Sequence, residues 1–243
     1  MHSLGSLLER MPLPLLWGFV GHAFVGILCL AARGFKAPPV MGVHPALKPF
    51  KFALSIALFL GTMGLLLPSL SVSPLTRSAL AWLFASTMVA EMVPILLQSL
   101  RGTTSHFNGR GALNGPLWTL MIVAIVLATL GLVCVALLAS FRPLIAADGR
   151  AMASIMAFAW RAGLWLLLLT PVSGFAMGGR GQHSVGGDDG GRGLPFVNWS
   201  VQHGDLRVAH FFALHAVQLL PVFAWLLLYL VADAGARWGL LLT

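Results

Sequence analysis

Charged residues are scarce in this chain. Asp, Glu, Lys and Arg make up 9% of its 243 residues, whereas 58% are hydrophobic. Typical soluble domains carry about 25% charged residues, so this shortfall excludes a soluble globular core. The composition is typical of a protein that crosses a membrane several times.

Acidic residues are fewer than basic ones, with seven Asp and Glu against fifteen Lys and Arg, for a net charge of +8. In a soluble protein this excess would indicate nucleic acid as a partner. No basic patch is interleaved with aromatic residues here, so we expect no nucleic-acid partner. Lys and Arg in the loops on one side of a membrane explain the charge better. Membrane lipids are the expected surroundings, and partner membrane subunits are compatible with this composition.

Cysteine is also rare. Cys29 and Cys134 both lie in apolar segments, which excludes a disulfide framework. The residues before Cys29 lack the small residue that a lipoprotein cleavage site requires. The first apolar run, Leu13 to Ala32, is too long for a signal-peptide core and predicts a retained helix.

Six apolar runs are long enough to cross about 30 Å of hydrocarbon. They cover approximately 12–32, 50–68, 76–100, 115–140, 151–176 and 207–232. The sequence therefore predicts one all-α domain over residues 1–243, a polytopic membrane bundle of six transmembrane helices. A further run, Trp238 to Leu242, is too short to cross, so a truncated seven-helix plan is also compatible.

The loops after the first, third and fifth spans hold most of the Lys and Arg and most of the unusual sequence. The positive-inside rule places this side in the cytoplasm. We therefore expect a multi-pass protein of the bacterial cytoplasmic (inner) membrane with both termini outside. The loops near 69–76 and 142–150 are short and plain. This asymmetry predicts a functional surface, or the mouth of a site, on one side.

Two ionisable residues lie deep inside apolar runs: Glu91 in the third and Arg161 in the fifth. Such residues face the bundle interior or water and are functional candidates. Counted from the nearest charged span end, His22 lies about 16 Å deep, Glu91 about 15 Å and His215 about 12 Å. We expect these three to meet in one layer, which Arg161 joins if the fifth helix ends near Pro171.

A shallower layer is expected nearer the mouth, from Gln98, His210, Lys48 and Lys51. Gln98 shares a face of its helix with Glu91, and Gln218 shares one with His215. We therefore count Gln98, His210, Gln218 and Arg161 with the two deeper histidines as candidate cofactor-binding groups. The basic residues around the mouth are candidates to hold an anionic headgroup or substrate: Lys48, Lys51, Arg101 and Arg207. Plain positive-inside bias explains these four equally well.

Three chemistries fit a His/Glu layer. The leading hypothesis is redox with bound haem b or quinone, in which His22 and His215 are ligands or hydrogen-bond partners and Glu91 accepts protons. The second is a metal-dependent hydrolase acting on lipid, with His22, Glu91 and His215 holding a divalent metal. It lacks the HExxH spacing that identifies such sites. The third is a non-enzymatic transport or accessory subunit with Glu91 as a relay group.

The fifth loop is rich in glycine but contains neither GxGxxG nor GxxxxGK, so a phosphate cradle is unsupported. Composition favours a flexible, solvated tip around His183, Asp188 and Asp189 over a cation site. Phe196 and Trp199 suit the headgroup region. We expect their segment, LPFVNW, to lie at the membrane interface and cover the bundle.

Several motifs carry a family resemblance. The segments RGTTSHFN (101–108) and GLPFVNWSVQHGDLRVAHFFALHAVQ (193–218), with EMVPILLQ (91–98) ahead of them, resemble a family of uncharacterised bacterial multi-pass membrane proteins. The similarity runs from HPALKPFKF (44–52) over most of the chain. No activity is established for that family, so the resemblance implies a shared fold and transfers no catalytic residue. Its members tend to have a further C-terminal span, which we expect this chain to lack.

Overall fold

The computed structural model describes the backbone of residues 4–241 and the side chains of residues 8–231. Its elements follow one another as α1 (Leu4–Arg10), α2 (Leu13–Ala32), α3 (Leu47–Leu66), η1 (Leu67–Ser69), α4 (Pro74–Leu100), α5 (Asn114–Phe141), α6 (Ser154–Leu167), α7 (Leu169–Arg180), β1 (Ser184–Val185), β2 (Gly204–Asp205) and α8 (Leu206–Leu241). The predicted all-α class is confirmed, since β1 and β2 form only a short antiparallel ribbon.

Six helical segments are long and apolar enough to cross a membrane. They are Leu13–Ala32, Leu47–Ser69, Pro74–Leu100, Asn114–Phe141, Ser154–Arg180 and Leu206–Val231. Each coincides with a predicted span, with ends shifted by a few residues. A helix forms in each run because hydrocarbon offers no partner for backbone N–H and C=O groups, which must therefore bond within the segment.

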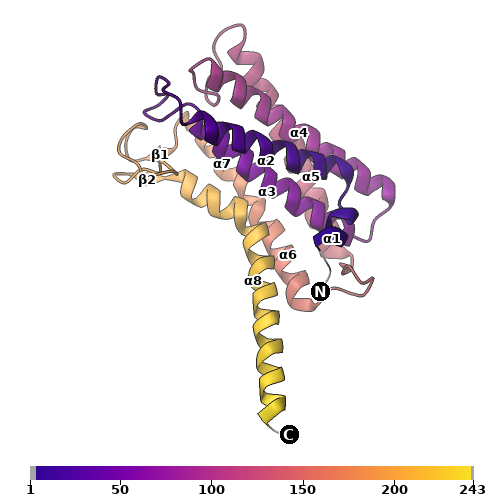
Figure 1. Ribbon diagram of the computed structural model, residues 1–243. Coiled ribbons are helices and arrows are strands. Elements are labelled where there is room, and N and C mark those ends of the chain that lie inside the picture. The colour runs from indigo at the N-terminus through magenta and orange to yellow at the C-terminus, as the bar shows by residue number, and fades with distance from the viewer. Residues whose placement is uncertain (1–3, 242–243) are drawn as a thin grey trace.

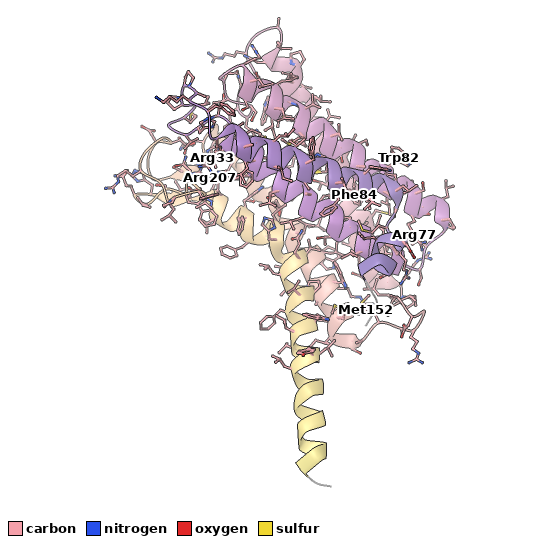
Figure 2. The ribbon with its side chains drawn as sticks, viewed as in Figure 1. Arg33, Arg77, Trp82, Phe84, Met152 and Arg207 are labelled. Carbon is pink, nitrogen blue, oxygen red and sulfur yellow. The ribbon has the colours of Figure 1, made fainter. Side chains whose placement is uncertain are left out.

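The helices pack in two connected groups. α2 packs on α3 and α4, and α4 packs on α5, while α8 packs mainly on α6 and α7. Figure 1 shows α2 to α5 running roughly together and α6 and α8 crossing them at a steep angle. The core of the first group is apolar, and its Phe84, labelled in Figure 2, is fully buried with its ring centroid 5.5 Å from that of Phe59 in an edge-to-face arrangement.

α6 and α8 approach closely because a glycine lies at their crossing. A Cβ added to Gly163 would lie 2.7 Å from the Cα of Val217. Small residues allow helix backbones to approach in this way within membranes. The first half of α8 therefore determines that this helix packs on α6.

The fifth span is broken but does not stop near Pro171. α6 ends at Leu167 and α7 continues from Leu169 to Arg180. Pro171 has no N–H and its ring crowds the carbonyl four residues earlier, which explains the break at this point. α8 in turn continues as one helix to Leu241, and so includes most of the short apolar run from Trp238.

The two ends of the bundle differ. Loops 33–46, 101–113 and 181–205 lie at one end, which we call the shared face. The opposite end, with loops 70–73 and 142–153, is called the plain face. α1 and the C-terminal part of α8 both lie away from β1 and β2, toward the plain face (Figure 1).

Candidate functional site

The three long loops of the shared face contact one another. Ser99, at the end of α4, donates from Oγ to the carbonyl of Pro45 at 2.9 Å. Lys51 Nζ donates to the carbonyl of Val197 at 3.2 Å. The rings of Phe107 and His183 lie 5.2 Å apart between centroids. Segments up to 146 residues apart in the sequence therefore form one surface.

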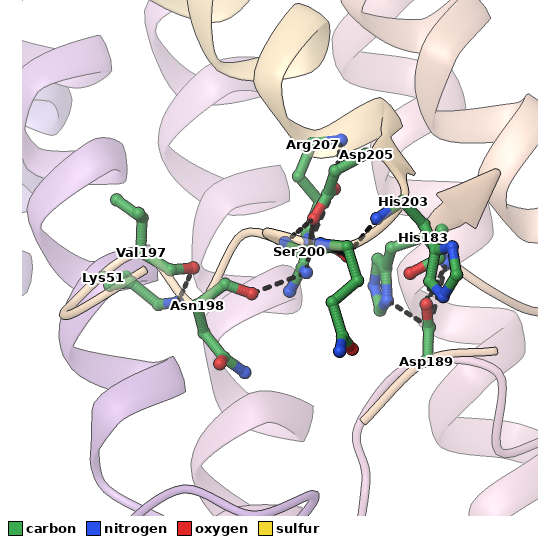
Figure 3. Close-up of polar contacts among 11 residues, drawn as sticks. Lys51, His183, Asp189, Val197, Asn198, Ser200, His203, Asp205 and Arg207 are labelled. Atoms are coloured by element: carbon green, nitrogen blue, oxygen red, sulfur yellow. Dashed lines mark hydrogen bonds and ion pairs between the residues drawn. The ribbon is translucent and has the colours of Figure 1, made fainter. Parts of the chain in front are cut away.

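An ion pair anchors the fifth loop where it enters α8 (Figure 3). Arg207 Nη2 lies 2.6 Å from Oδ2 of Asp205, whose side chain is only 2% exposed. The same carboxylate accepts the backbone N–H of Ser200 at 2.8 Å, and Arg207 also donates to the carbonyl of Asn198 at 2.6 Å. Burial alone would raise the pKa of Asp205, but these hydrogen bonds outweigh it and lower the pKa. Asp205 is therefore ionised and structural.

The loop is held in a strained conformation. Phe196 and Asn198 have positive φ angles of 69° and 56°, and Phe107 in the third loop has 59°. Non-glycine residues adopt this region at a cost of about 1–3 kcal/mol each, and such residues cluster at functional sites. Here the Arg33 guanidinium stacks 5.2 Å from the Phe196 ring centroid and helps to fix it. The LPFVNW segment, which we call the lid, thus contacts the C-terminal end of α2 and the start of α3.

A histidine and a carboxylate pair beside this lid. His183 Nδ1 lies 2.7 Å from Asp189 Oδ2, and Asp189 also accepts the backbone N–H groups of His183 and Ser184 at 2.9 and 2.8 Å. Burial would raise the pKa of Asp189, but these hydrogen bonds lower it far below its usual value. Burial lowers the pKa of His183, although Asp189 opposes the shift. The imidazole is therefore neutral, with its Nδ1–H on Asp189 and Nε2 as an acceptor.

Aromatic rings form the wall next to this pair. The His106 ring lies 5.3 Å from that of Phe52 and 5.6 Å from that of Trp118, and Phe107 packs 5.9 Å from Trp118. Ser105 Oγ lies 3.0 Å from His106 Nδ1. The pKa of His106 falls well below its usual value because of burial first, and then the positive charge of Lys48. The rings of this wall are tilted by 52–88° to one another, and they present apolar edges and faces.

The basic residues predicted to hold a headgroup mostly bond within the protein. Arg101 Nη1 donates to Gln98 Oε1 at 2.6 Å and to Asn114 Oδ1 at 2.8 Å. Lys51 and Arg207 bond the carbonyls of the lid and Asp205, as described above. Lys48 lies 5.9 Å from the centre of the Phe52 ring. The bonds of Lys51, Arg101 and Arg207 organise the loops, which gives these three residues a structural role without any ligand.

The deeper residues are buried, and the bonds recorded for His22 and Gln218 stay within their own helices. His22, Glu91 and His215 are each at most 8% exposed. His22 Nδ1 bonds the carbonyl of Gly18 at 2.7 Å, and the His215 ring lies 4.5 Å from that of Phe211. Gln218, with its amide oriented to satisfy its partners, donates to the carbonyls of His215 and Leu214.

Within the described residues, no three His, Cys, Asp or Glu side chains are grouped as metal ligands. The predicted metal triad of His22, Glu91 and His215 is therefore not formed. The reason is packing: α2 packs on α3 and α4, whereas α8 packs on α6 and α7. The same separation argues against His22 and His215 as the two axial ligands of one haem.

Arg161 and His210 lie apart from that layer as well. Arg161 Nε donates to the carbonyl of Ala139 at 2.7 Å and Nη2 to that of Arg142 at 3.4 Å, so it caps the end of α5 at the plain face. It does not join the Glu91 layer because the fifth span continues to Arg180. His210 Nδ1 lies 3.0 Å from Ser173 Oγ and joins α8 to α7.

The sequence did not predict the roles of four residues: His106, His183, Asp189 and Asp205. It placed His183 and Asp189 on a flexible tip, but the structure folds that tip around the Asp189 carboxylate. A signal was present, since the acid follows the histidine by six residues across two glycines, a spacing that allows the chain to turn back.

Comparisons of the chain with protein-family models, with curated proteins and with solved structures found no match. The family resemblance of the RGTTSHFN and GDLRVAHF segments therefore stays a prediction. The site is interpreted from its geometry.

Proposed function

We propose that this membrane protein binds the head of a quinone-class amphiphile at the shared face and exchanges a proton with it through His183. The observation that carries the proposal is the 2.7 Å bond between His183 Nδ1 and Asp189 Oδ2, beside a wall of aromatic rings. A neutral imidazole oriented by a carboxylate is the arrangement of a general base.

The surroundings favour a planar head with oxygen atoms that accept hydrogen bonds. Lys51, Arg101 and Arg207 already bond groups of the protein, so Lys48 is the remaining cation near His183. The other surface next to His183 is formed by rings, from Phe107 and its neighbours. Rings of this kind stack on flat ligands and contribute apolar contact area. A quinone head offers a matching face and oxygen atoms that accept or donate hydrogen bonds.

Proton exchange follows from the state of His183. Its Nε2 can accept a hydrogen bond from a quinol hydroxyl. When an electron acceptor outside this chain oxidises the quinol, Nε2 takes the proton and Asp189 stabilises the imidazolium. Glu91 lies seven residues before Gln98 on the same face of α4, and both side chains are buried. We infer that Glu91 is the next proton acceptor toward the interior. The proposal covers binding and proton exchange and assigns no electron-transfer group to this chain.

Binding is tested by titrating a short-chain ubiquinol, which carries the hydroxyl donors, into detergent-purified protein and following quenching of tryptophan fluorescence, since Trp118 belongs to the wall. We expect saturable binding, and His183→Ala should weaken it by about tenfold, as expected for one lost hydrogen bond in a partly buried site. His203→Ala is the matched control, because His203 is an exposed histidine of the same loop.

The proposal is wrong if quenching is not saturable. It is also wrong if His183→Ala and His203→Ala both bind as tightly as the unmodified protein. Thermal unfolding of each variant shows that the comparison is made on folded protein. Glu91→Gln should leave binding unchanged and slow the release of the proton, which a pH-indicator dye measures when added ferricyanide oxidises the bound quinol.

A further inference from the structure

A groove on the plain face lies between the starts of α2 and α4, away from the shared face. Its volume is about 450 Å³. Arg10, Arg77, Ser78 and Trp82 line it, together with Leu13 and the prolines of the two helix starts. Figure 2 labels Arg77 and Trp82, which both project from the first turns of α4. The groove therefore combines two cations with an aromatic wall.

The two arginines come from different elements. Arg77 is fixed in place, because Nε donates to the carbonyl of Leu67 at 3.2 Å and Nη2 to that of Leu70 at 3.3 Å. A guanidinium carries five N–H donors, so these two bonds leave others for the groove. Arg10 approaches from the end of α1. No acidic residue is among those that line the groove, and phosphate is an anion that arginine forks recognise well.

The helix starts themselves supply few donors here. Pro12 and Pro14 flank the first residue of α2, and Pro74 begins α4. Proline has no backbone N–H, and the Ser73 hydroxyl already accepts the N–H of Thr76 at 3.1 Å. Anion binding at this place therefore depends on the arginine side chains and the Ser78 hydroxyl, and not on backbone N–H groups.

The remaining wall is apolar and open to the membrane. Leu13 is 66% exposed and Trp82 is 62% exposed. Trp82 lies eight residues after Pro74, about 12 Å along the helix, and its side chain leans back toward the helix start. Tryptophan is enriched where headgroups meet hydrocarbon. The groove thus has the polarity of an amphiphile, cationic at one end and apolar along its side.

We propose that this groove holds the phosphate of an anionic glycerophospholipid between Arg10 and Arg77, with an acyl chain along Leu13 and Trp82. An anionic lipid fits better than a zwitterionic one, because a choline or ammonium headgroup would meet two arginines and no carboxylate. The site is independent of the quinone proposal, since it lies at the other end of the bundle.

The test uses the full chain in nanodiscs that contain phosphatidylglycerol and phosphatidylcholine in equal amounts. Native mass spectrometry counts the lipids that remain bound after release. We expect phosphatidylglycerol to be retained preferentially and Arg10→Gln to weaken its retention about fivefold, the effect of one basic residue at a membrane surface. Arg10→Lys should keep most of the retention. The control is Arg150→Gln, an exposed arginine of the plain face outside the groove.

Three results would overturn the proposal. The first is equal retention of the two lipids by the unmodified protein. The second is unchanged retention of phosphatidylglycerol in Arg10→Gln, and the third is an equal loss in Arg150→Gln. A separate arm adds inorganic phosphate at the concentration of the lipid: displacement of the lipid would show that only the phosphate is recognised, and would also overturn it.

Discussion

The two faces of the bundle use arginine for different partners. On the plain face, Arg77, Arg142 and Arg161 donate to backbone carbonyls near the ends of helices and turns. On the shared face, arginine has side-chain partners as well: Arg207 bonds the Asp205 carboxylate in addition to the Asn198 carbonyl, and Arg101 bonds the side chains of Gln98 and Asn114. A carbonyl partner completes a helix end or a turn, whereas these side-chain partners fix where a long loop meets its helix.

Loop length explains why the partners differ. The plain-face loops are short and close by backbone pairing, including the bridges Leu70↔Leu144 and Ile145↔Ala151. The long loop 181–205 has only β1 and β2 as regular structure. Its remaining backbone groups need side chains as partners, because an unpaired polar group at a buried position is costly. The comparison teaches that a carboxylate in these loops is first a structural group.

The largest loss of stability is expected at Asp205, where the structural role of a carboxylate is strongest. Asp205→Asn should lower the free energy of unfolding by about 3 kcal/mol, because it leaves the charge of Arg207 without a buried partner. Unfolding in detergent, followed by circular dichroism against denaturant, measures the change. Asp188→Asn removes an exposed carboxylate of the same loop and should change little. Equal effects of the two variants would contradict the structural role of Asp205.

A smaller loss of stability is expected for a substitution on the plain face. Arg161→Gln should destabilise the protein by about 2 kcal/mol, because it removes charged hydrogen bonds to the carbonyls that end α5. The same unfolding measurement applies. If Arg161→Gln instead changed the spectrum or the ligand binding of the shared face without lowering stability, Arg161 would reach the Glu91 layer. The contrast between the two faces would then not hold.

The faces should also differ in pH dependence. The pKa values of His106 and His183 are lowered in the folded protein, so the unfolded chain binds protons on these residues more readily. Their contribution to stability is present above the unfolded value of about 6.5 and is lost as the pH falls below it. Melting temperatures measured from pH 7.5 to 5 should therefore fall, and the fall should be shallower in His106→Gln. If His106→Gln leaves the slope of melting temperature against pH unchanged, His106 is not the source of the pH dependence.

The smallest effect on stability is expected for Arg150, a charged residue without a buried partner. Arg150 is 87% exposed and lies 3.9 Å from Asp148, itself 48% exposed. Exposed ion pairs are weak and screened by salt, so Arg150→Gln should leave the melting temperature unchanged within error. A clear loss would show that plain-face charges matter beyond their backbone bonds.

The sequence alone determined the number and place of the six spans. Hydrocarbon requires every backbone group to bond within its segment, so apolar runs such as Leu13–Ala32 can only be long helices. It also determined that loops one, three and five share a face, since each crossing reverses the side of the membrane. Depth along a helix follows from residue counts in the same way.

Only the tertiary structure decided which side chains meet. The spans are apolar around most of their circumference, so local pattern does not fix the rotation of a helix or the order of its neighbours. His22 and His215 have similar depths but lie on helices with different partners, and Arg161 turns to the end of α5. His183 reaches Asp189 through a glycine-rich turn whose path no periodicity encodes. The physical reason is that depth is a property of one helix, whereas contact depends on how several helices and loops pack together.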